Sequence, residues 1–332
     1  MELTSIILNS FTNLLHAPIL AFILGLLAVA LKSDLEIPPQ IAKFLALYLL
    51  FHIGIKGGEE LFHSGITIDS FKVIGVCILI SFMTPWIFNK ILRVRLNVFD
   101  AGAIAASYGS ISAVNFIASA SLLDAAKIAY SGYMVACMAF MESPAIIAGL
   151  IIIGFANKGA DYSQDKTKLS FRKVLHEALF NGSVFLLIGS MLIGLLSGNS
   201  GQVELKPFVD DIFKGMLTFY MLDMGILAAQ RIKGIKGNIL FLGSFALFYP
   251  IVSAVFAIFI AKFIGLNIGN AFLFTTLVSS SSFIAVPASM RLAAPQANIG
   301  ILLAMSLGIT FVFNIILGPP IYLPLIKYVW GL

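Results

Sequence analysis

The fold is decided by two short polar stretches, YGSISAVN at residues 108–115 and VSSSSFIAVP at residues 278–287. Each lies in the middle of an apolar run long enough to enter a bilayer. Clusters of serine and glycine disfavour an uninterrupted helix that faces lipid. They suit a helix that breaks at mid-membrane and turns its freed backbone groups toward a ligand. The two stretches therefore predict a pair of broken helices that meet at a binding site.

The composition is that of an all-α polytopic membrane protein. Of the 332 residues, 59% are hydrophobic and 11% are charged, and the mean hydropathy is +1.00; a soluble domain carries about 25% charged residues. The net charge of +5 does not indicate a nucleic-acid partner, because Lys and Arg lie mainly between apolar segments. The histidines show no metal-binding spacing, and the sequence contains no catalytic motif, so it favours a transporter over an enzyme.

Ten segments are apolar and long enough to form spanning helices, which need about 20 residues each. They are residues 14–32, 39–56, 72–91, 98–121, 127–156, 175–197, 208–229, 239–262, 268–293 and 298–329. A polar stretch at 157–173 divides them into two sets of five. We therefore expect one five-span repeat in residues 1–157, a cytoplasmic linker in 158–173 and a second five-span repeat in 174–332.

The distribution of basic residues predicts the orientation. If the N-terminus lies outside, the inner side holds 14 of the 21 Lys and Arg residues and the outer side holds 7, which follows the positive-inside rule. Both termini then lie outside the plasma membrane of a bacterial cell. With five spans each, the halves enter the membrane in opposite directions and form an inverted repeat. An offset of 171 residues supports the repeat, because it lays Gly109-Ser110 on Ser280-Ser281.

The two breaks predict an anion site. The helix fragment after a break begins with unpaired N–H groups and a partial positive charge, which attract an anion without a charged side chain. The fragment before it ends in unpaired carbonyls, which suit sodium. The plainer interpretation is that small residues let helices pack closely. The expected anion-binding residues are Gly109, Ser110, Ser112, Ser280, Ser281 and Ser282.

Carboxylates inside apolar segments predict a sodium site, because a buried charge in lipid is costly and usually functional. Glu142 and Asp223 could each bind sodium or relay a proton, or could be hydrogen-bonded between helices. Thr310 and Asn314 supply neutral oxygens in the last span, although packing explains them equally well. We expect sodium as the coupling ion near these four side chains, and no other metal. Arg291 is expected to hold the inner face rather than the anion.

Four motifs carry a resemblance to a known family. They are the run from DAG at 100–102 to YGS at 108–110, MESPAI at 141–146, YMLDMG at 220–225 and IAVPASMR at 284–291. Together they look like the sodium-dependent bicarbonate transporter family, which was named for cyanobacteria, and the chain is closer to the broader bacterial branch of that family. The resemblance implies sodium-driven bicarbonate uptake, a 5+5 inverted-repeat fold with a core and a gate domain, elevator-like movement and a homotrimer.

The chain departs from the cyanobacterial members in two ways. They carry an aspartate where Glu142 stands, and the extra methylene can reshape a cation site. Their linker is longer than residues 157–173, which puts a partnership with the family's small PII-like cytoplasmic regulator in question. Two alternatives for function stay open, namely symport of another small monocarboxylate or oxyanion, and a membrane sensor that binds an anion without moving it.

Overall fold

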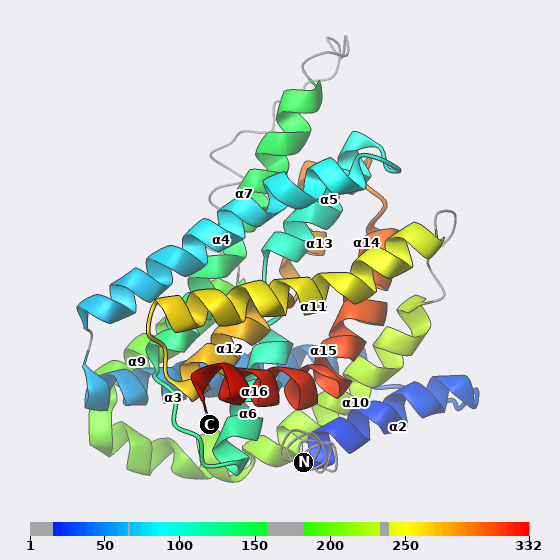
Figure 1. Ribbon diagram of the computed structural model, residues 1–332. Helices are drawn as coiled ribbons and strands as arrows, with labels where there is room; N and C mark the ends of the chain where they lie inside the picture. The colour runs from blue at the N-terminus through cyan, green and yellow to red at the C-terminus, as the bar shows by residue number, and fades with distance from the viewer. Residues whose placement is uncertain (1–15, 66, 158–181, 233–238, 332) are drawn as a thin grey trace.

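The computed structural model describes residues 16–65, 67–157, 182–232 and 239–331, and these residues form helices without any strand (Figure 1). The first half of the chain contains α2 (Ala17–Ala30), α3 (Pro39–Ser64), α4 (Ile68–Leu92), α5 (Val98–Gly109), α6 (Ala113–Ala125) and α7 (Tyr133–Asn157). The second half contains α9 (Gly182–Lys206), the π-helical turn η2 (Pro207–Asp211), α10 (Phe213–Ile232), α11 (Ile239–Phe263), α12 (Ile268–Ser279), α13 (Ala285–Ala293), α14 (Ile299–Met305), the π-helical turn η3 (Ser306–Phe311), α15 (Val312–Ile316) and α16 (Gly318–Trp330). The expected linker at 158–173 lies outside the described residues.

Seven helical segments of the described chain are long and apolar enough to cross a membrane. They are Pro39–His63, Ile68–Leu92, Val98–Ala125, Tyr133–Gly154, Gly182–Arg231, Leu240–Phe263 and Ile299–Ile316. Two shorter apolar helices, α2 and α12, fall below that length. The chain is therefore an all-helical, multi-pass membrane protein.

Both expected helix breaks are confirmed. The first interrupts the apolar segment between α5, which ends at Gly109, and α6, which begins at Ala113. The second lies between α12, which ends at Ser279, and α13, which begins at Ala285. Figure 1 shows α5 and α13 on one side of the crossing and α6 and α12 on the other, and each of these pairs is in contact. The two broken helices thus cross with opposite chain directions.

The two first fragments are built alike. Each has 12 residues and begins with an asparagine cap, Asn97 or Asn267, whose side-chain oxygen accepts N–H groups of the first turn. Each ends at a serine in extended backbone, since Ser110 has φ −89° and ψ −176° and Ser280 has φ −88° and ψ 177°. The fragments therefore match at an offset of 170 residues, one fewer than the offset of 171 found in the sequence.

Four helices outside the crossing pack as two close pairs, α2 along α10 and α3 along α9. Glycines at the contacts let the backbones approach. A Cβ atom at Gly225 would lie 2.1 Å from the carbonyl oxygen of Phe22, and one at Gly25 would lie 2.3 Å from that of Leu222. Such close approach between small residues is a usual way for membrane helices to associate.

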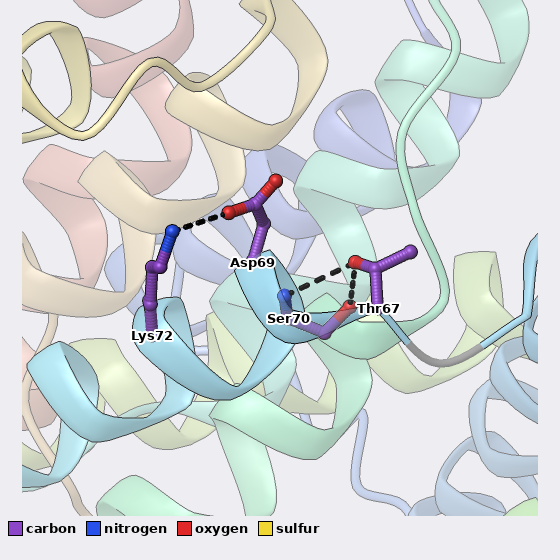
Figure 2. Close-up of polar contacts among 4 residues, drawn as sticks. All are labelled: Thr67, Asp69, Ser70 and Lys72. Atoms are coloured by element: carbon purple, nitrogen blue, oxygen red, sulfur yellow. Dashed lines mark hydrogen bonds and ion pairs between the residues drawn. The ribbon is translucent and has the colours of Figure 1, made fainter.

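Local signals fix where individual helices begin and end. Thr67 caps α4, because its Oγ1 accepts the N–H of Ser70 at 3.3 Å, and the exposed Asp69–Lys72 ion pair at 2.8 Å lies on the same turn (Figure 2). The expected last span, 298–329, is divided, because α15 ends at Ile316 and α16 starts a new helix with two prolines in its first turn. Proline has no N–H group with which to continue the preceding helix.

We expect Gly225→Ala to destabilise the protein. The new methyl group would meet backbone atoms of α2, which cannot rotate away, and overpacking typically costs about 1–3 kcal/mol. The measurement is the thermal unfolding temperature in detergent. Gly243→Ala in α11 is the matched control, because no atom lies within 4 Å of a Cβ there, and alanine is the better helix former. Equal unfolding temperatures for the two variants would contradict the close α2–α10 packing.

Candidate functional site

The two helix breaks are joined by reciprocal hydrogen bonds. The N–H of Ser282 donates to the carbonyl of Ser107 at 2.8 Å, and the hydroxyl of Ser107 donates to the carbonyl of Ser282 at 2.6 Å. The N–H of Ser112 donates to the hydroxyl of Ser280 at 3.0 Å. All four serines are buried. The expectation that the two breaks meet is therefore confirmed.

Tyr249 of α11, which was not among the expected site residues, connects both breaks. The single proton of its hydroxyl lies between the carbonyls of Tyr108 and Val278, the latter at 3.0 Å. These are among the last carbonyls of α5 and α12, and a carbonyl there has no intrahelical partner. The signal in the sequence was a tyrosine followed by a proline, at 249–250, inside an otherwise apolar segment.

Thr310 and Asn314 also form hydrogen bonds with residues of the broken helices and of the helices beside them. The hydroxyl of Thr310 donates to the carbonyl of Ala246 at 2.7 Å and therefore accepts the hydrogen bond from the Tyr108 hydroxyl, also at 2.7 Å. The amide nitrogen of Asn314 donates to the carbonyl of Ser279 at 2.9 Å, and its oxygen accepts from Tyr322 at 2.7 Å. Thr310 and Asn314 were expected to bind sodium, and in this structure both side chains are hydrogen-bonded to other protein groups.

A small cavity of about 40 Å³ lies at the crossing. Of the ten expected site residues, three line it, namely Ser112, Ser282 and Glu142. The starts of α6 and α13 line it too, through Ala113, Val114, Ile284 and Ala285. The first N–H groups of a helix lack intrahelical partners and carry partial positive charge. Two helix N-termini and one carboxylate side chain thus converge on the same small space.

Helices outside the crossing close the cavity. Leu50 of α3 and Val184 and Leu187 of α9 form an apolar wall. The wall belongs to one of the close helix pairs, whereas the polar groups belong to the broken helices. These residues could not be predicted from the sequence, because an aliphatic side chain in an apolar segment carries no signal of its own.

The other expected anion-binding residues do not line the cavity and instead contact neighbouring protein groups; they are Gly109, Ser110, Ser280 and Ser281. The hydroxyls of Ser110, Ser280 and Ser281 donate to the carbonyls of Glu142, Leu277 and Ser306 at 3.4, 2.9 and 3.5 Å. Gly109 allows α4 to approach, because a Cβ atom there would lie 2.6 Å from the ring of Pro85.

Asp223 lies on α10, apart from the cavity lining. It is buried, and its Oδ2 has no hydrogen-bond partner among the described residues. The same holds for Asn115 Oδ1 and Thr275 Oγ1. Buried polar atoms are nearly always satisfied, so these three oxygens are exceptions within the described residues. The described chain contains no cluster of three or more His, Cys, Asp or Glu side chains suited to a metal.

The geometry limits what can bind. One water molecule occupies about 10–15 Å³ on the same measure, so a cavity of about 40 Å³ accepts a ligand of a few heavy atoms. The converging N–H groups and hydroxyls donate hydrogen bonds, as an anion requires. The site therefore suits a small oxyanion.

Residues 17–327 match the family model described as the Na+-dependent bicarbonate transporter superfamily. No curated protein matches the chain. The match covers nearly the whole sequence, including both helix breaks and every residue that lines the small cavity. The chain therefore belongs to the Na+-dependent bicarbonate transporter superfamily.

Proposed function

We propose that the protein is a secondary transporter that couples inward sodium movement to bicarbonate uptake and holds the anion in the cavity between the two breaks. The observation that carries the proposal is the convergence of two helix N-termini and the hydroxyls of Ser112 and Ser282 on about 40 Å³. Bicarbonate, with one carbon and three oxygens, is of that size. Its oxygens accept hydrogen bonds from N–H and O–H donors, as the cavity offers.

Glu142 gives a physical reason for sodium coupling. Its side chain lines the same cavity as the proposed anion, and two negative charges about 4 Å apart repel by about 4 kcal/mol at an effective dielectric constant of 20. A sodium ion between them turns this repulsion into attraction. By linkage, sodium then raises the affinity for the anion as much as the anion raises the affinity for sodium.

The proposed ten spans form two inverted repeats, residues 1–157 and 174–332. The offset of 170 residues between α5 and α12 supports this, and so does the pairing of helices. In the proposed repeats α2 corresponds to α9, and α3 corresponds to α10. The α2–α10 pair therefore corresponds to the α9–α3 pair, and both pairs are in close contact. In the same way, the contact of α4 with α5 corresponds to that of α11 with α12.

We further propose that α2, α3, α9 and α10 form a gate against which the broken helices move. The Lys56–Asp124 ion pair, at 2.7 Å, joins α3 of this gate to α6 of the moving part. By the positive-inside distribution, this ion pair lies on the outer side and both termini are outside the plasma membrane. The homotrimer stays a proposal from the family resemblance.

A small monocarboxylate is the second candidate cargo. The cavity has apolar walls, with Met138, Leu187 and Phe283 beside the polar groups, and a methyl group would fit against them. Neutral donors do not by themselves distinguish a carboxylate from bicarbonate. Competition of unlabelled formate and acetate against labelled bicarbonate separates the two cargoes.

Reconstituted protein is expected to take up labelled bicarbonate in sodium buffer and not in choline buffer. Inward movement of each excess positive charge gains about 2.3 kcal/mol per 100 mV, so an inside-negative potential should increase the uptake if more than one sodium ion accompanies each anion. The measurement is the initial rate into proteoliposomes, with empty liposomes as the control. Equal rates in sodium and choline would reject sodium coupling.

Ser282→Ala is expected to weaken bicarbonate binding more than Ser281→Ala. Ser282 lines the cavity, whereas the Ser281 hydroxyl faces the carbonyl of Ser306. A lost hydrogen bond to a charged ligand costs about 1.5–3 kcal/mol, or about 10- to 150-fold in affinity. The KM for bicarbonate and the unfolding temperature are measured for both variants. A larger KM increase in Ser281→Ala would place the anion elsewhere.

Glu142→Gln is expected to reduce the stimulation of uptake by sodium while the fold is kept. The amide removes the negative charge that a sodium ion would neutralise and preserves the shape of the side chain. The measurement is the sodium concentration dependence of the uptake rate. Asp211→Asn, at an exposed carboxylate away from the cavity, is the control. An unchanged sodium response in Glu142→Gln would make Glu142 a structural residue.

A further inference from the structure

A second and larger cavity adjoins the small one. Its volume is about 280 Å³, and it shares Phe283 and Ile284 with the small cavity. Its walls come from α10, from the start of α13, and from α14 and η3. Because the two cavities share these lining residues at the second break, a route to the small cavity from this side would pass through the larger one.

Two arginines, Arg231 and Arg291, are the charged residues of this lining, which is otherwise apolar. Arg231 lies in the last turn of α10 and Arg291 in the last turn of α13. Neither pairs with a carboxylate within the described ranges 16–65, 67–157, 182–232 and 239–331. Two positive charges that face one apolar cavity without a counter-ion raise the local potential and attract an anion.

The chemistry of the pair favours a phosphate group. A guanidinium presents a planar fork of N–H donors that matches the oxygens of a phosphate, often with two hydrogen bonds. Two guanidinium charges favour an anion that carries up to two negative charges over one that carries a single charge. The volume is near the lower limit of about 300 Å³ for small-molecule sites, so the cavity accommodates a group larger than the small cavity can hold.

We propose that this cavity binds a phosphate group between Arg231 and Arg291, and that the bound group obstructs the route to the small cavity. Arg231 belongs to the helix pair α2–α10, whereas Arg291 belongs to a broken helix. A phosphate held by both would therefore also tie the proposed gate to the proposed moving part. Obstruction rests on the proposed transport function, but phosphate binding does not.

Binding is tested on the purified full-length protein in a neutral detergent. Isothermal titration with inorganic phosphate, at constant ionic strength, compares the wild type with Arg231→Gln and Arg291→Gln. We expect each substitution to weaken binding by about 10- to 150-fold, as for the loss of a charged hydrogen-bond partner. Arg93→Gln is the matched control, because Arg93 at the end of α4 is exposed, as Arg231 and Arg291 are, but lies outside this lining.

The source of the phosphate group is tested in a second arm. Protein in nanodiscs of zwitterionic phosphatidylcholine is titrated with phosphatidylglycerol, whose phosphodiester headgroup leaves one net negative charge. Binding of free phosphate that depends on both arginines identifies a soluble ligand, and arginine-dependent binding of the lipid alone identifies a headgroup. If neither ligand distinguishes Arg231→Gln and Arg291→Gln from Arg93→Gln, the proposal is overturned. Arg231→Lys and Arg291→Lys keep the charge and replace any glutamine variant that fails to fold.

Obstruction is tested in proteoliposomes that carry inorganic phosphate on one side or the other. Phosphate on the side of the arginines should slow bicarbonate uptake several-fold in the wild type and leave the Arg231→Gln/Arg291→Gln double variant unaffected. Equal slowing in both proteins would overturn the obstruction. If bicarbonate transport itself fails, the titrations still decide whether the phosphate site exists.

Discussion

The constraint on which this structure depends is that every backbone polar group inside the apolar layer must find a partner. Breaking two helices there frees carbonyls at the end of one fragment and N–H groups at the start of the next. The chain satisfies the carbonyl side with protein groups, through Tyr249 and Asn314 and through the N–H of Ser282. On the N–H side, the hydroxyl of Ser112 accepts the N–H of Asn115 and that of Ser282 accepts the N–H of Val286. The first residues of α6 and α13, Ala113, Val114 and Ala285, line the small cavity, and this placement is the basis of the proposed anion site.

The helix breaks could be predicted from the sequence because serine and glycine runs inside long apolar segments are a strong local signal. Which individual serines of the breaks line the cavity could not be predicted from the sequence. Ser110 and Ser112 are two positions apart, yet one hydroxyl faces a carbonyl of α7 and the other belongs to the cavity. The difference is set by the extended backbone at Ser110 and by the register of the opposite break, which no local pattern records.

Thr310 and Asn314 illustrate the same limit. Neutral oxygens in the last span predicted a sodium site, and the structure engages both side chains with backbone carbonyls far away in sequence. A polar side chain in an apolar helix signals only that it has a partner. Whether the partner is an ion or a carbonyl depends on tertiary contacts. The need for glycine at position 225 of α10 is likewise set by a tertiary contact, because a Cβ atom there would lie 2.1 Å from the carbonyl oxygen of Phe22.

A charge balance around the small cavity bears on how many sodium ions the proposed anion requires. Each helix N-terminus contributes about half a positive charge, so the starts of α6 and α13 together supply about one. The side chain of Glu142, when ionised, and a bicarbonate ion together bring two negative charges. One negative charge is left over in a space of about 40 Å³ bounded by apolar side chains, where an unbalanced charge is costly. One sodium ion or one proton on Glu142 restores neutrality. Any further sodium ion would have to bind outside this cavity, because a second positive charge inside it would leave the balance positive.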